Sequence, residues 1–108
     1  MNEEHKKPSA TEKRYAKHVG KLFWELQSDW DYDARRNKYS YALVMVVGLN
    51  RRWGRGRFEY MLHQPASTDD WRREYRYAAR EFERDIKQRR MLPVEPGNPN
   101  PPEYKENQ

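Results

Sequence analysis

The chain lacks several features that would assign it to a functional class. It has 108 residues and no cysteine, which excludes disulfide bonds and thiol nucleophiles and removes the ligands of most structural zinc sites. No hydrophobic run approaches the roughly 20 residues of a membrane span, and the opening MNEEHKKPSA has no apolar stretch of the secretory-signal type. We therefore expect a cytoplasmic protein with no membrane contact.

Catalytic and metal-binding patterns are also missing. The three histidines are scattered, no Ser–His–Asp grouping is visible, and no glycine-rich loop precedes an expected helix. Asp29, Asp31 and Asp33 have the spacing that begins a calcium loop, but Ala34 and Ser40 stand where such a loop needs Gly and Glu. The sequence predicts no enzymatic activity, no cofactor, no metal and no small-molecule substrate.

What the chain does contain is charge and aromatic surface. Hydrophobic residues make up 35% and charged residues 36% of the sequence, so the core must be thin. The 4 Trp, 8 Tyr and 3 Phe partly compensate, because each aromatic ring buries a large area. Lys and Arg total 22 against 17 Asp and Glu, a net charge of +5. A basic balance favours acidic partners such as nucleic acid or an acidic protein surface.

The length allows one domain, and composition predicts its limits. Residues 1–8 are polar and indicate a disordered N-terminus, residues 9–91 a single α+β domain, and residues 92–108 a disordered tail. The tail has P-x-x-P spacings of the kind that SH3-type domains bind, but we favour a plain unstructured end. Its prolines are Pro93, Pro96, Pro99, Pro101 and Pro102.

A first helix is predicted over Ala10–Gln27. Ser9 and Glu12 form an S-x-x-E capping box immediately before an apolar pattern with helical spacing. The residues of that apolar stripe are Tyr15, Val19, Leu22, Phe23, Leu26 and Trp30.

A hairpin is predicted next. The segment Tyr39–Leu49 is rich in β-branched and aromatic residues, which predicts a strand with apolar residues on both faces. The segment Arg57–Gln64 resumes the alternation after the glycine-containing stretch Asn50–Gly56, so the two strands should pair in antiparallel fashion. A further short strand at Trp30–Asp33 is left open.

A second helix is predicted over Asp69–Arg90, with acidic residues at the positive end of its dipole. Its apolar stripe is Trp71, Tyr75, Ala78, Ala79, Phe82 and Ile86. The expected fold is therefore α+β: a small antiparallel sheet of two or three strands packed against two amphipathic helices, in the order α-β-β(-β)-α.

This order resembles that of double-stranded-RNA-binding domains. That family opens its second helix with a lysine-rich motif that grips phosphate, whereas this chain has Asp69 and Asp70 there. The resemblance is limited to topology, and we transfer none of the family's residues.

Two groups of basic residues are the candidate sites. The first is the outer face of the second expected helix: Arg73, Arg76, Arg80, Arg84 and Lys87. The second is the tip of the hairpin: Arg51, Arg52, Trp53, Arg55 and Arg57. Arginine binds phosphate through two parallel hydrogen bonds, and tryptophan stacks on bases or fills interface pockets. A solvated helix face is the competing interpretation of the first group.

Three functions remain open. The basic groups predict a non-enzymatic protein that contacts nucleic acid or a nucleoprotein complex. The alternative is an inhibitor or adaptor of the bacteriophage or mobile-element type, which would dock on an acidic surface of a host protein machine. A structural homodimer is the third, with strand 39–49 paired across a two-fold axis. Whether the two basic groups form one surface depends on how the second helix packs.

Overall fold

The computed structural model describes residues 9–51, 57–65 and 73–105. Its elements are α1 (Ala10–Ala16), β1 (Leu22–Asp31), β2 (Arg36–Arg51), β3 (Phe58–His63), β4 (Glu74–Ala78), α3 (Ala79–Lys87) and β5 (Met91–Pro93). The strands form one five-stranded sheet in the order β4-β3-β2-β1-β5, and each neighbouring pair is antiparallel. The fold is α+β, but the expected two- or three-stranded sheet and the expected order of elements were wrong.

The predicted helix over Ala10–Gln27 is wrong beyond its first two turns. Ser9 caps α1 as predicted, with its side chain accepting a hydrogen bond from the Glu12 N–H. The helix ends at Ala16, and Gly20 then adopts a φ of 86°, which only glycine reaches without a steric penalty. The chain turns there and continues as β1. The helical spacing was misleading because it also fits residues that alternate along a strand.

The predicted helix over Asp69–Arg90 is wrong in its first half. Residues Glu74–Ala78 form β4, and only Ala79–Lys87 are helical. Tyr75 and Tyr77 explain the difference: two residues apart, they share one face of a strand, whereas in a helix they would point in nearly opposite directions. Pairing with β3 buries both rings partly against the core. The acidic residues predicted at the positive end of its dipole, Asp69 and Asp70, lie outside the described part of the chain.

The predicted hairpin is confirmed, with β2 and β3 antiparallel. Val44 and Val46 of β2 are fully buried and face the core. A register shift between Val46 and Gly48 then moves Leu49 to the core side as well. The β-bulge inserts one extra residue and so reverses the alternation that the sequence predicts.

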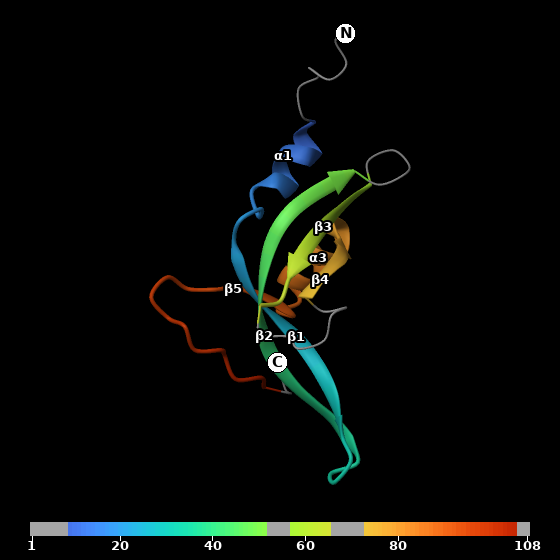
Figure 1. The fold of residues 1–108 in the computed structure, drawn as a ribbon, viewed down its shortest axis with the longest axis vertical. Helices are drawn as coiled ribbons and strands as arrows, with labels where there is room; N and C mark the ends of the chain where they lie inside the picture. The colour runs from blue at the N-terminus through green and yellow to red at the C-terminus, as the bar shows by residue number, and fades with distance from the viewer. Residues whose placement is uncertain (1–8, 52–56, 66–72, 106–108) are drawn as a thin grey trace.

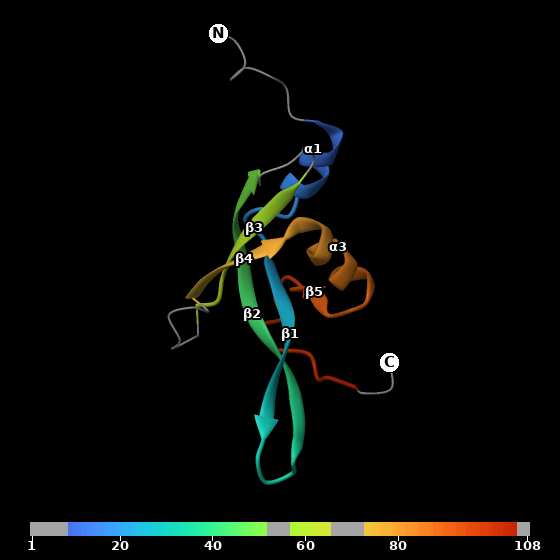
Figure 2. The same cartoon turned by 90° about the vertical axis from the view of Figure 1, so that its right-hand side faces the viewer.

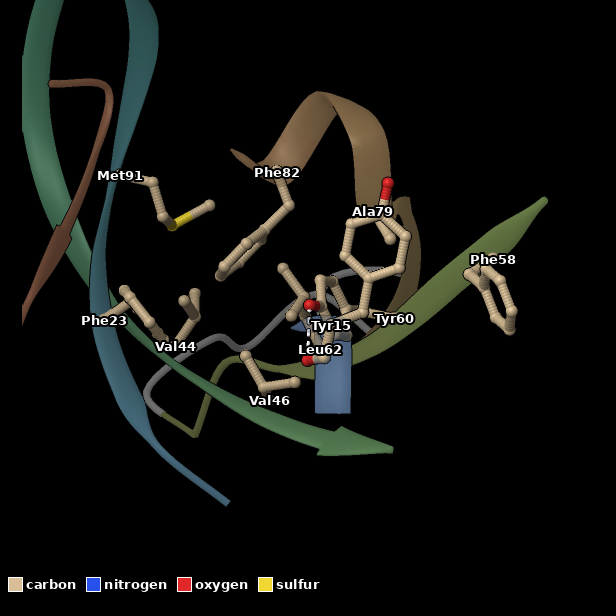
Figure 3. Close-up of a cluster of buried hydrophobic side chains, with 10 residues drawn as sticks. All are labelled: Tyr15, Phe23, Val44, Val46, Phe58, Tyr60, Leu62, Ala79, Phe82 and Met91. Carbon is tan, nitrogen blue, oxygen red and sulfur yellow. Dashed lines mark hydrogen bonds between the residues drawn. The ribbon is translucent and has the colours of Figure 1, made fainter. Parts of the chain in front are cut away.

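The core lies between one face of the sheet and the two helices. Figure 2 shows α1 and α3 on the same side of the sheet, with α1 near the end of the β2–β3 hairpin. The ring of Phe82 from α3 points into the core, where it packs against Phe23 and Tyr60 at centroid distances of 5.0 and 4.8 Å (Figure 3). The Tyr60 hydroxyl donates to the Tyr15 carbonyl at 2.6 Å and ties α1 to β3.

Strand β2 is a central strand, paired with β1 on one edge and β3 on the other. Strand β3 pairs only with residues 45–51 of β2, so residues 39–44 have β1 on one edge and no paired strand on the other among the described residues. The pairing with a second copy considered from the sequence stays a prediction. Beyond the body, residues 26–31 of β1 and 36–41 of β2 pair only with each other and project as a two-stranded arm (Figure 1). At the end of this arm, the Asp31 carboxylate accepts from the Asp33 and Ala34 N–H groups.

The predicted domain limits fall partly outside the described residues. Residues 1–8 are not described, and β5 includes Leu92 and Pro93 of the expected tail. Met91, which precedes them, is fully buried in the core. The division into a domain with disordered ends otherwise stays a prediction.

Candidate functional site

The outer side of α3 carries three cations in a row. Arg80, Arg84 and Lys87 are exposed and follow one another at helical spacing. The opposite side of the helix buries Ala79 and Phe82 in the core. The core contact therefore fixes the direction in which the cations point, namely away from the sheet.

A fourth cation faces this row from α1. The Arg14 guanidinium forms an ion pair with Glu83 at 3.2 Å and a hydrogen bond with the Tyr15 hydroxyl at 3.2 Å. These two contacts raise the pKa of Arg14 above its ordinary value, and the contact with Tyr15 has the larger effect. A surface cavity of about 660 Å³ lies between the two helices. Its lining residues are Arg14, Tyr15, Arg80, Glu81, Glu83, Arg84 and Lys87.

The charges of this helical groove do not cancel, since four cations line it against the carboxylates of Glu81 and Glu83. Arg84 lies 3.4 Å from the buried Asp85, whereas neither Arg80 nor Lys87 forms an ion pair with another described residue. Glu83 also approaches His18 at 4.0 Å. Burial lowers the pKa of that histidine, so it is neutral near pH 7 and adds no charge to the groove.

The end of the β2–β3 hairpin next to its connecting loop contacts α1 through Arg51. Arg51, the last residue of β2, pairs with Glu12 at 2.7 Å and places its guanidinium 5.9 Å from the Phe58 ring centre. Arg57 is exposed just before β3. Glu12 and Arg14 are two residues apart and therefore point to nearly opposite sides of α1. The helix thus separates Arg51 from the groove, and a helix with its side chains is about 10–12 Å wide.

The other candidates are not part of this arrangement. Arg76 lies on β4 opposite Met61, on the face away from the core, and its guanidinium is 3.8 Å from Glu59. Arg73 precedes β4 at the end remote from the hairpin tip, and its carbonyl accepts from the Gln64 N–H. The predicted row of five cations on one helix is therefore divided: Arg73 and Arg76 belong to the β4 region, and the other three lie on α3. Arg52, Trp53 and Arg55 lie outside the described residues.

Sequence reasoning missed Arg14, and no motif marks it. It follows from helical position only once α1 is known to pack beside α3. Two partly buried contacts were also missed: the Tyr75 hydroxyl donates to Glu25, and the Tyr77 hydroxyl donates to Asp85. Burial first, and then the bond to Asp85, raise the pKa of Tyr77, which keeps its hydroxyl protonated. These bonds tie β4 to β1 and α3.

Among the described residues, no group of His, Asp and Glu side chains is placed to hold a metal ion. The helices of the described part are too short and too polar to cross a bilayer. No protein-family model matches the chain, and neither a curated protein nor a solved structure is detectably similar to it.

Proposed function

We propose that the protein is a non-enzymatic binding protein that contacts nucleic acid through the side of the molecule formed by α1 and α3. The observation that carries the proposal is the helical groove, where Arg14 from one helix meets Arg80, Arg84 and Lys87 from the other. Two of these cations have no acidic partner among the described residues. A row of cations whose charge is only partly neutralised is suited to the phosphates of a nucleic-acid backbone, whose binding releases condensed counterions.

The hairpin extends the proposed contact. Arg51 contacts Glu12 of α1, and Arg57 is exposed just before β3. In the sequence, Arg52, Trp53 and Arg55 lie between these two arginines. In this proposal the arginines bind phosphate, and Trp53 stacks on a base or inserts between bases. The absence of cysteine supports a cytoplasmic site of action.

Two matched double variants test the proposal. Arg80→Gln/Arg84→Gln removes two charges from the groove, and Arg73→Gln/Arg76→Gln removes the same two charges elsewhere. Binding of labelled duplex DNA, single-stranded DNA and RNA should be followed by fluorescence anisotropy between 50 and 200 mM salt. The groove variant should bind more weakly, with a salt slope smaller by about 1.8 logarithmic units if both arginines contact phosphate of a duplex. The control should retain the slope of the unmodified chain.

Absence of binding to all three probes at micromolar protein and 50 mM salt would overturn the proposal. An acidic protein surface is the competing partner. It would be indicated if a pull-down recovers one protein whose retention survives nuclease treatment and is lost in the groove variant.

A further inference from the structure

The face of the sheet opposite the helices carries a buried tryptophan. Trp24 follows Phe23 on β1 and therefore points away from the core. Its neighbours across the sheet are Leu43 on β2 and Leu92 on β5. Trp24 is only 7% exposed, although α1 and α3 pack on the other face. Another part of the chain must cover it.

That cover is the C-terminal segment, residues 94–105. It leaves β5 with a bond from the Val94 N–H to the Leu22 carbonyl at 3.1 Å, then turns at Gly97, which has a φ of 81°. It returns to the sheet where the ring of Tyr104 packs on Tyr39 at 5.1 Å. Figure 1 shows the segment as a wide loop that leaves β5 and returns towards β1 and β2.

The cover is held at its two ends and is loosely attached between them. In the part of the chain that the structure describes, no hydrogen bond or ion pair joins residues 95–105 to the rest of the molecule. Its prolines have no N–H to donate to a sheet edge. Apolar contact with Trp24 and the ring pair at Tyr104 therefore provide most of the attachment.

The cover also leaves space against the tryptophan. A cavity of about 700 Å³ is lined by Leu22, Trp24 and Leu43 from the sheet and by Pro96 and Pro99 from the cover. A second cavity of about 500 Å³ also touches Trp24 and is lined by further prolines of the same segment. The sheet face thus has more apolar surface than its own segment fills.

We propose that the Trp24 face is a docking site for an extended, proline-rich segment of another protein, and that residues 94–105 occupy part of it in the isolated chain. A proline-rich partner is inferred because the chain's own C-terminal segment places prolines against Trp24 and an aromatic ring against Tyr39. Extended proline-rich segments bind aromatic-lined grooves with little loss of conformational freedom, since they are already ordered before binding. This site is on the opposite face from the helical groove, so it does not depend on nucleic-acid binding.

The test is a titration of the full-length protein with a synthetic decaproline peptide, followed by the NMR resonance of the Trp24 indole N–H. Tyr104→Ala weakens the attachment of the cover and should tighten decaproline binding about two- to tenfold relative to the unmodified chain, the equivalent of one lost aromatic pair. Tyr32→Ala is the matched control. That tyrosine is 83% exposed at the end of the arm and should leave the affinity unchanged.

Three results would overturn the inference. One is a Tyr104→Ala variant that keeps its circular dichroism spectrum but does not respond to decaproline at the Trp24 resonance. Another is an equal response to a Gly-Ser peptide of the same length. The third is a mass that doubles with concentration in light scattering of the unmodified chain and returns to the monomer on adding decaproline, since a second copy would then be the occupant.

Discussion

The two faces of the sheet are built from alternate residues of the same strands, yet they are covered in different ways. Phe23 and Val44 face two helices, whose backbone hydrogen bonds are satisfied internally and whose outer sides remain free for charge. Trp24 and Leu43 face a proline-rich segment that leaves cavities against them. The helical face therefore provides stability and a charged outer surface, whereas the other face keeps apolar surface that is only partly used.

The comparison predicts that removal of a core ring costs far more than removal of a side chain on the Trp24 face. Phe82→Ala should lower the free energy of unfolding by about 3–5 kcal/mol, because the ring is fully buried among other rings. Leu22→Ala, at a position 37% exposed, should cost less than about 1 kcal/mol. Urea denaturation measures both, and similar losses would break the comparison.

Removal of a tyrosine hydroxyl group should also lower stability more on the core face of the sheet than on the Trp24 face. Tyr60→Phe leaves the Tyr15 carbonyl without its buried donor and should cost about 1–3 kcal/mol. Tyr39→Phe on the other face removes a hydroxyl from a ring that is 40% exposed and should change stability by less than about 0.5 kcal/mol. Thermal unfolding of the two variants side by side would decide.

Alkaline pH should lower the stability of the fold through tyrosines on the helical face of the sheet. Burial raises the pKa of Tyr60 and of Tyr77 above the usual 10. The folded state therefore keeps protons that the unfolded state releases. The contribution of these two tyrosines to stability is constant well below pH 10 and falls above it, by at most about 1.4 kcal/mol per pH unit and tyrosine. Tyr77→Phe should make this decline shallower, as urea midpoints at pH 9, 10 and 11 would record. An unchanged slope would contradict the burial of this hydroxyl.

A smaller effect on stability than that of any core ring is expected at the cover. Tyr104→Ala should cost less than about 1.5 kcal/mol, since one ring pair is lost from a segment held by few contacts. It should nevertheless speed solvent exchange of the Trp24 indole N–H in NMR spectra, while the buried core amides keep their protection. A loss as large as that of Phe82→Ala would show that the two faces stabilise the fold equally.

The sequence alone determined the features that depend on neighbouring residues in the chain. The Ser9 cap, the hairpin of β2 and β3 and the thin aromatic core follow from side-chain chemistry and from alternation along the chain. The sequence also marked the cations now found in the helical groove, except Arg14. It predicted two long helices where each segment divides into a helix and a strand, because a few apolar residues fit both spacings.

Only the tertiary structure decided between those spacings. Residues 22–31 and 74–78 became strands because β2 and β3 offered edges to pair with, and that pairing buries Tyr75, Tyr77 and Phe23 on one side. The same pairing separated Arg76 from Arg80 and brought Arg14 to α3. The spacing of apolar residues along the chain does not reveal which distant segments form backbone hydrogen bonds with one another. The position of the groove and the cover over Trp24 could therefore not be predicted from the sequence.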